Sequence, residues 1–174
     1  VLGISSISIT NMMTKKSVEY SENIVPVVEE IGLARRNMIS VRRYLLNAII
    51  AGNQDDYARV QTSMNTDREA LYASLDKIKA IEPNYASTID EIREKLQSVS
   101  SYNANIMELS ADFGNQTAIE QAYDIYLNSY APTFDEAADM IIALNEQINQ
   151  DVQAQELTVT NARTVAIGIV IGIL

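Results

Sequence analysis

Four of the chain's 13 cationic side chains are arginines that fall within nine residues, a density that indicates anion recognition. They are Arg35, Arg36, Arg42 and Arg43. A guanidinium group binds a carboxylate through two parallel hydrogen bonds, so this cluster suits an organic acid or an amino acid. Arg35 and Arg42 are seven residues apart, which places both on one face of a helix, where they can converge on one anion. We therefore predict a ligand site at this cluster.

The arginine cluster also has a purely structural interpretation. From Leu96 to Ala162 the chain has ten Asp or Glu residues and no Lys or Arg. Acidic side chains of other helices can therefore neutralise the arginines within the chain. The candidates are Glu120, Asp124, Asp135 and Asp139.

Three tyrosines share helical spacing near Pro132, namely Tyr123, Tyr126 and Tyr130. This spacing favours core packing, and an aromatic-ligand pocket is the alternative. Either interpretation requires the three residues to lie on one helix.

Other kinds of chemistry are largely excluded by composition. The 174-residue chain contains no histidine and no cysteine, the residues that supply most general bases, thiol nucleophiles and zinc ligands. Its net charge of -10 argues against binding to nucleic acid, which requires clustered basic residues. The sequence has no glycine-rich phosphate loop and no metal-ligand spacing. We therefore expect no enzymatic activity, no cofactor and no nucleic-acid partner.

The helix-breaking residues divide the chain into long segments of equal length. Gly52, Pro83 and Gly114 stand 31 residues apart, twice in succession. A helix of that length extends about 45 Å, and equal helices joined by short turns pack antiparallel. The predicted fold class is all-α: an antiparallel up-down-up-down four-helix bundle with long helices, of which the first and last continue into transmembrane spans.

The first long helix has the clearest apolar pattern. Apolar residues recur at alternating steps of three and four over more than three heptads, which predicts a buried seam. The seam residues are Ile24, Val27, Ile31, Ala34, Met38, Val41, Leu45 and Ala48. Gly52 is expected to end this helix in the left-handed conformation, and Asn53 to cap the next one.

The last long helix carries two local signals. Thr117 and Glu120 have the spacing of a capping box, which predicts a helix start. Pro132 predicts a break or kink soon afterwards, because proline lacks the N–H that an α-helix needs. Thr133 is then expected near the point where the helix restarts.

Both ends of the chain are apolar and resemble parts of membrane-spanning helices. Residues 1–13 are uncharged, and Lys15 and Lys16 follow them; residues 163–174 are apolar after Arg163. A bilayer crossing needs about 20 apolar residues, so each end is predicted to be part of a longer span. Residues 14–162 then form one extramembrane domain. The alternative is that both ends are buried termini of a soluble helical protein.

These features together resemble the four-helix-bundle ligand-binding (sensor) domain of bacterial methyl-accepting chemotaxis receptors. The resemblance rests on the truncated spans, the four long helices, the arginine-rich first helix, and Tyr130-x-Pro132-Thr133 in the last helix. It implies a homodimeric sensor outside the cytoplasm, in the inner or plasma membrane of a bacterial cell. It also implies that ligand is held at the dimer interface and that the last helix transmits the signal.

In the aspartate and serine receptors of this family, arginines of the first helix and a threonine of the last helix hold the ligand. The resemblance matches Arg42 and Thr133 to these positions, whereas Met38 stands where another arginine is expected. Arg35 and Arg36 are candidates to replace it. The ligand implied is an organic acid, an amino acid or an aromatic acid, bound directly or through a periplasmic binding protein.

Two other functions fit the same residues. A sensor domain of this fold can also belong to a histidine kinase or to a cyclic-dinucleotide signalling protein. A non-sensing helical surface protein is the third interpretation, and it predicts that carboxylates of the same chain neutralise the arginine cluster.

Overall fold

The described part of the chain folds into helices and short connections. A computed structural model describes residues 11, 14–15, 18 and 20–171. Its elements, in chain order, are η1 (Tyr20–Ile24), α2 (Val25–Ile49), α3 (Gln54–Ile81), η2 (Pro83–Tyr85), α4 (Ala86–Ser98), α5 (Ser100–Ser110), α6 (Gln116–Ile125), η3 (Tyr126–Tyr130) and α7 (Ala131–Ile171). None of the described residues forms a strand, so the prediction of an all-α fold is confirmed.

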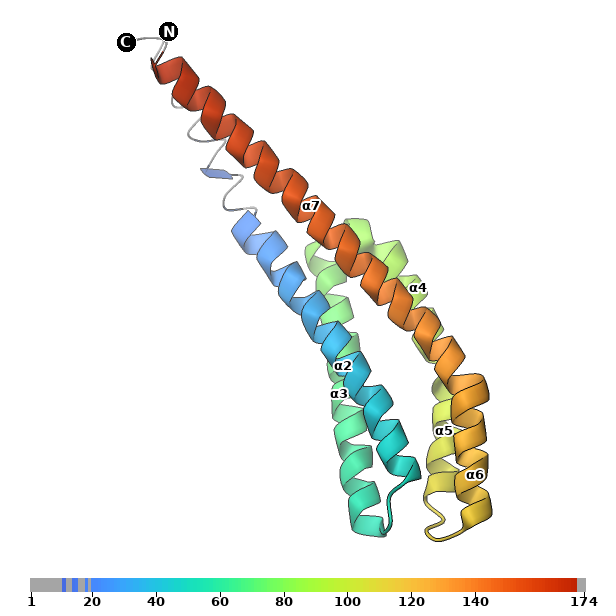
Figure 1. Cartoon of the computed structure of the whole chain (residues 1–174). Helices are drawn as coiled ribbons and strands as arrows, with labels where there is room; N and C mark the ends of the chain where they lie inside the picture. The colour runs from blue at the N-terminus through green and yellow to red at the C-terminus, as the bar shows by residue number, and fades with distance from the viewer. Residues whose placement is uncertain (1–10, 12–13, 16–17, 19, 172–174) are drawn as a thin grey trace.

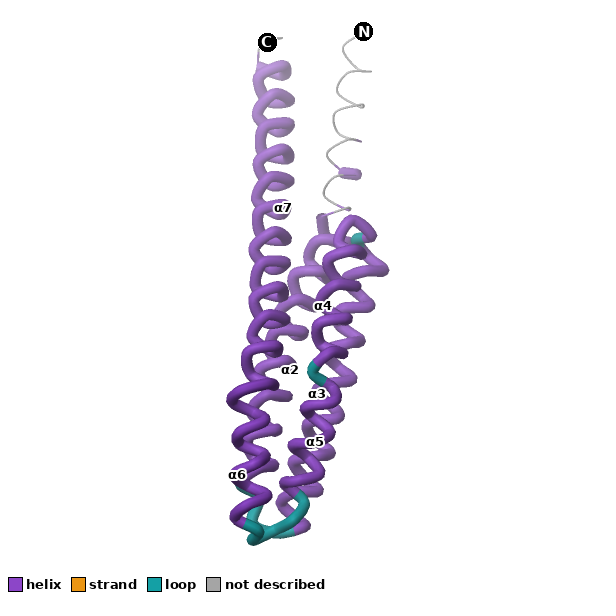
Figure 2. The backbone as a smooth tube through the Cα atoms, turned by 90° about the vertical axis from the view of Figure 1, so that its right-hand side faces the viewer, coloured by secondary structure: helices purple, strands orange, loops and turns teal. Residues whose placement is uncertain are grey.

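The elements form four long helical segments packed as a four-helix bundle (Figures 1 and 2). The segments are η1–α2, α3, η2–α4–α5 and α6–η3–α7. Helix α2 packs against α3, α5 and α7, and α7 also packs against α4. Residues that are far apart in sequence, at the start of α7 and in the middle of α2, are thereby brought together.

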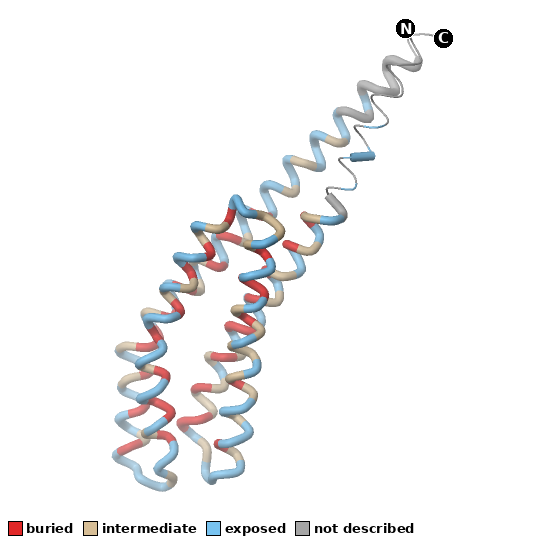
Figure 3. Tube along the Cα trace, turned by 180° about the vertical axis from the view of Figure 1, so that it is seen from behind, coloured by how far each residue is buried: buried red, intermediate tan, exposed pale blue. Residues whose placement is uncertain are grey.

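The core confirms the predicted apolar seam. All eight seam residues, from Ile24 to Ala48, are at most 5% exposed. They face buried residues of the other segments, including Leu75, Ile92 and Ile141. Buried positions follow the inner faces of the helices, and exposed positions cover the outer faces (Figure 3). Burial of this apolar surface is the main source of stability in such a bundle.

The predicted helix ends are partly confirmed. Asn53 caps α3, because its side-chain oxygen accepts a hydrogen bond from the Asp56 amide at 2.9 Å. The expectation for Gly52 is wrong, since the described residue with positive φ is Gly114, at 82°. The capping residue of α6 is Asn115 and not Thr117, whose own amide donates to the Asn115 side chain at 3.1 Å. Asn115 takes this role because it directly follows the left-handed turn at Gly114.

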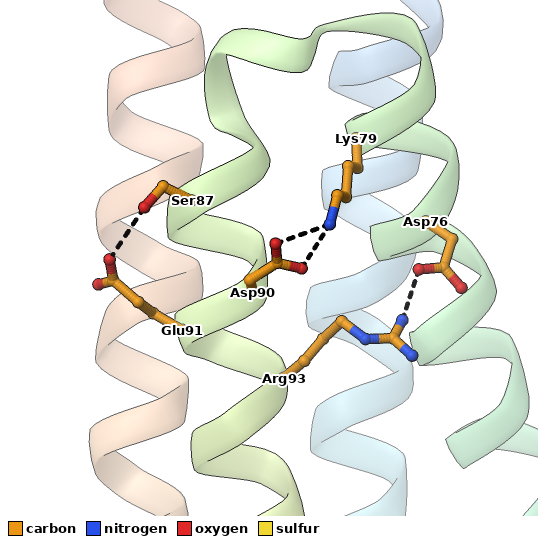
Figure 4. Close-up of polar contacts among 6 residues, drawn as sticks. All are labelled: Asp76, Lys79, Ser87, Asp90, Glu91 and Arg93. Carbon is orange, nitrogen blue, oxygen red and sulfur yellow. Dashed lines mark hydrogen bonds and ion pairs between the residues drawn. The ribbon is translucent and has the colours of Figure 1, made fainter.

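Ion pairs hold the turn between α3 and α4. Lys79 donates to both carboxylate oxygens of Asp90 at 2.6 and 2.7 Å, and Arg93 donates to Asp76 at 2.5 Å (Figure 4). The Arg93 guanidinium also lies 4.9 Å from the centre of the Tyr72 ring. Lys79 and Arg93, which lie outside the arginine cluster, are therefore already paired with acidic residues.

Of the break or kink predicted at Pro132, the break does not occur. Helix α7 begins at Ala131, and η3 directly before it is a π-helical turn that joins α6 to α7 without a loop. The Ala131 amide donates to the Tyr126 carbonyl, five residues back, instead of four. Because proline has no N–H, a wider turn at this point accommodates Pro132 and keeps the helix continuous. Thr133 therefore lies in the first turn of α7 and not after a break.

The predicted membrane segments are only partly within the described residues. The backbone of α7 continues as a helix to Ile171, whereas residues 1–10, 12–13 and 172–174 lie outside the described part. Within that part, no helix has both the length and the apolar character of a bilayer span.

Candidate functional site

The best-defined polar site lies where the middle of α2 meets η3 and the start of α7. The Arg42 Nε group donates a hydrogen bond to the Tyr126 hydroxyl at 2.9 Å, and Arg42 Nη1 forms an ion pair with Asp135. The side chains of Arg42 and Asp135 are 37% and 52% exposed. A cation and an anion are thus fixed at the contact between the first and last long segments, within reach of solvent.

The contact with Asp135 bears directly on the interpretation of the arginine cluster. Asp135 is one of the four acidic residues expected from the sequence as an internal partner, and it does pair with Arg42. Two of the other candidates bond within their own helical segment: Glu120 accepts from Gln116 at 3.0 Å, and Asp124 accepts from Asn128 at 2.7 Å.

An aromatic stack forms the inner wall of this site. The rings of Tyr126 and Tyr130 have centroids 5.5 Å apart, and those of Tyr130 and Phe134 are 5.1 Å apart, with interplanar angles of 26° and 24°. All three side chains are buried, so Tyr126 and Tyr130 pack in the core. Tyr123 is 39% exposed and lies outside this stack. The stack holds the Tyr126 hydroxyl in place for its contact with Arg42.

Tyr130 carries a polar group that the fold leaves without a partner. Its side chain is completely buried, and its hydroxyl has no hydrogen-bond partner among the described residues. Burial raises the pKa of Tyr130; the nearby Tyr126 and Asp135 raise it further, and Arg42 lowers it. A buried hydroxyl without a partner is unfavourable for folding, so the Tyr130 hydroxyl lowers the stability of the folded chain.

Hydrogen bonding also raises the pKa of Arg42. The Tyr126 hydroxyl is the largest cause of a raised pKa of Arg42, burial opposes it, and Asp135 adds to it. The guanidinium is therefore positively charged throughout the ordinary pH range.

The other predicted site residues lie near Arg42 in sequence but do not share its contacts. Arg35, Arg36 and Arg43 are exposed, and within the described part of the chain none of them forms an ion pair. The Arg43 guanidinium lies 5.1 Å from the centre of the adjacent Tyr44 ring. Only Arg42 of the four therefore reaches the last segment.

Thr133 lies two residues before Asp135 and is partly buried. Its hydroxyl donates to the Ser129 carbonyl at 3.0 Å, within its own segment. This bond still leaves the hydroxyl oxygen able to accept a hydrogen bond. The structure brings Thr133 into the neighbourhood of Asp135 but records no contact between Thr133 and Arg42.

The sequence does not identify Tyr126 and Asp135 as the partners of Arg42. The sequence shows only that Tyr126 shares helical spacing with two other tyrosines and that Asp135 is one of several acidic residues in the last segment. The distance along the chain, 84 and 93 residues, carries no information about which acid or tyrosine meets Arg42. The relative shift of α2 and α7 determines which side chains meet Arg42, and the packing of the core sets that shift.

Comparison of the chain with protein-family models, with curated proteins and with solved structures finds no match. Among the described residues, no three acidic side chains are grouped so that they could hold a metal ion. The geometry around Arg42 is therefore the main evidence for a function of this chain.

Proposed function

We propose that this chain is the extracytoplasmic ligand-sensing domain of a transmembrane chemoreceptor of the methyl-accepting type, in a bacterial inner or plasma membrane. In this proposal the four long segments alternate in direction, up-down-up-down, and the first and last continue into the membrane. The chain has no catalytic role and binds no cofactor. One observation carries the proposal: the half-exposed Arg42 guanidinium lies at the contact between the first and last long segments.

The ligand proposed is a small molecule with a carboxylate group, an organic acid or an amino acid. Arg42 uses Nε for Tyr126 and Nη1 for Asp135, and among the described residues its Nη2 group donates no hydrogen bond. A guanidinium held on one side by an aromatic hydroxyl is pre-oriented, which reduces the entropy lost on binding. Thr133 is proposed to accept a hydrogen bond from the ligand.

A homodimer is part of the proposal, and the surface of α2 supports it. Exposed apolar residues continue the stripe of Arg35 and Arg42 at steps of three and four: Val25 is 41% exposed, Val28 is 37% and Ile39 is 58%. A second copy seated on this stripe would cover these side chains. It would also bring Arg35, Arg36 and Arg43 of both copies near the Arg42 sites, which gives these three residues their proposed ligand-binding role.

The proposed signal is a change in the position of α7 relative to α2. A ligand bound between them favours one arrangement only by its difference in affinity for the two arrangements. Helix α7 has 41 residues and is about 60 Å long, so a shift at Arg42 is carried far along the segment. The same sensor can serve a histidine kinase or a cyclic-dinucleotide enzyme, and a periplasmic binding protein can replace the small ligand.

A second candidate is a non-sensing helical surface protein, which the ion pair between Arg42 and Asp135 favours. In that case the arginine is already neutralised and no small molecule binds. The two candidates predict opposite results in the same experiment.

The experiment is a thermal-unfolding screen of the purified chain with organic acids and amino acids. A ligand at 100 times its Kd stabilises the folded state by about 2.7 kcal/mol. In a chain of this size that raises the Tm by about 5–10 °C. Arg42→Ala should abolish the rise in Tm. Arg59→Ala should leave it unchanged, because Arg59 lies on α3 and pairs there with Asp56. Hits that survive Arg42→Ala, or no hits at all, would contradict the proposal.

A further inference from the structure

We infer that Asp135 is an internal competitor for Arg42, which an incoming anion must displace, so that binding breaks the polar contact between α2 and α7. The inference deepens the proposed function and rests on it, since it describes how ligand reaches the same arginine. It assigns to Asp135 the control of affinity and the link between binding and helix movement.

The competition follows from the chemistry of the pair. Asp135 presents to Arg42 Nη1 a carboxylate, the same group that the proposed ligand carries. Two carboxylates cannot share these donors without repulsion at close range. A ligand carboxylate that binds Arg42 in the two-bond geometry therefore requires Asp135 to leave.

Asp135 is free to leave at little expense. Its side chain is 52% exposed, so the released carboxylate is solvated by water. Arg42 keeps its bond to the Tyr126 hydroxyl through Nε, 2.9 Å long, and that contact holds the guanidinium in place during the exchange. The arginine is thus oriented by one partner and blocked by the other.

The exchange also acts on the bundle. Among the described residues, the ion pair of Arg42 with Asp135 is the one side-chain polar contact that joins α2 to α7. Helix α7 has separate contacts with other segments, from Lys95 to Glu136 at 2.6 Å and from Tyr85 to Asp151 at 2.6 Å. Displacing Asp135 removes this polar contact between α2 and α7, while the apolar packing of the two helices and the other polar contacts of α7 stay in place.

The ligand can bind only to molecules in which Asp135 has left Arg42. Its apparent affinity is therefore the intrinsic affinity multiplied by the fraction of molecules in which Arg42 is free. Exposed ion pairs of this kind shift such equilibria by about twofold to fivefold. Removing the charge of Asp135 should therefore tighten anion binding at Arg42 by at least that factor.

The test uses sodium sulfate as a simple oxyanion and the arginine Nε–H signals in ¹⁵N nuclear magnetic resonance spectra of the purified chain. The Arg42 signal is identified by its loss in Arg42→Lys. In Asp135→Asn this signal should shift at sulfate concentrations at least twofold lower than in the unmodified chain, with sodium chloride of equal ionic strength as the reference. Asp135→Ala, which removes the group entirely, should behave the same way.

Glu136→Gln is the matched control, because Glu136 is the neighbouring acid on α7 and pairs with Lys95 instead. It should leave the Arg42 titration unchanged. Equal titrations in the unmodified chain and in both Asp135 variants would overturn the inference, as would an equally large effect of Glu136→Gln.

The outcome separates this inference from the proposed function. If an organic acid stabilises the chain through Arg42 but the Asp135 variants bind sulfate no better, the sensor proposal stands and the competition is wrong. If the variants bind sulfate better but no organic acid stabilises the unmodified chain, Asp135 does block Arg42 and the sensor proposal is wrong.

Discussion

Replacing Tyr130 with phenylalanine should make the protein more stable, which is the opposite of the usual effect of a core substitution. The Tyr130 side chain is fully buried, and its hydroxyl has no partner among the described residues. A buried polar group of this kind costs about 1–3 kcal/mol in desolvation. Phenylalanine keeps the ring that stacks between Tyr126 and Phe134 at 5.5 and 5.1 Å, so the aromatic packing is retained.

The expected gain in the free energy of unfolding for Tyr130→Phe is about 1–2 kcal/mol, because the small space left by the oxygen offsets part of the benefit. This corresponds to a rise in Tm of about 2–8 °C for a chain of this size. The assay is urea unfolding followed by circular dichroism at 222 nm, with thermal unfolding as a second measure.

Two other tyrosines provide matched controls for the Tyr130 variant. The Tyr57 hydroxyl donates to the Met107 carbonyl at 2.8 Å, and the Tyr85 hydroxyl donates to the Asp151 carboxylate at 2.6 Å. Both residues are buried, so Tyr57→Phe and Tyr85→Phe should each lower stability by about 0.5–1.5 kcal/mol. Destabilisation of 1 kcal/mol or more by Tyr130→Phe would refute the reasoning, since it would mean that the hydroxyl has a favourable partner.

Further predictions concern local features of the fold. Gly114→Ala should lower stability by about 1 kcal/mol, because Gly114 has a φ of 82°. Gly52→Ala should be neutral or slightly stabilising, because Gly52 has an ordinary φ and open space around it. Urea unfolding compares the two variants. Asn53→Ala removes the cap of α3 and should cost about 1 kcal/mol in the same assay. Leu45→Ala should cost about 2–5 kcal/mol, because Leu45 is fully buried in the core. Stability should fall as pH rises above about 10. Burial raises the pKa of several tyrosines in the folded state, so these tyrosines ionise first in the unfolded chain. Each contributes a loss of up to about 1.4 kcal/mol per pH unit, which urea unfolding at pH 9 and pH 11 measures.

The sequence predicts the secondary structure and core of this protein well because both depend on local periodicity. The seam from Ile24 to Ala48 follows alternating steps of three and four without exception, and every seam residue is buried. The cap at Asn53 is equally local, since a short polar side chain bonds an amide three residues away. Such features need no knowledge of the rest of the chain.

The errors arise where several local solutions compete. Proline at position 132 is compatible with a broken helix, a kinked helix or a widened turn, and the structure adopts the π-helical turn from Tyr126 to Tyr130. Packing decides this outcome, because the turn keeps Tyr126, Tyr130 and Phe134 stacked in the core. Likewise, Asn115 and Thr117 are both able to cap a helix, and the left-handed turn at Gly114 favours Asn115.

For the candidate site, the sequence predicts which kinds of residue take part but not how they are arranged. The density of arginines on the first helix identifies Arg42 and its neighbours as a group, but not which of them meets the last helix. Arg42 is selected because its position on α2 faces Tyr126 of η3 and Asp135 of α7, a consequence of the relative shift of two helices. Arg35, Arg36 and Arg43 have the same chemistry and remain exposed.

The most direct test of the account is a structure of the chain bound to the strongest stabilising acid from the thermal screen. We expect the carboxylate of that compound on the Arg42 guanidinium, the bond from Arg42 to Tyr126 retained, and Asp135 turned away into solvent. A compound bound elsewhere, with Arg42 still paired to Asp135, would contradict the claim that this arginine is the point at which the protein recognises its ligand.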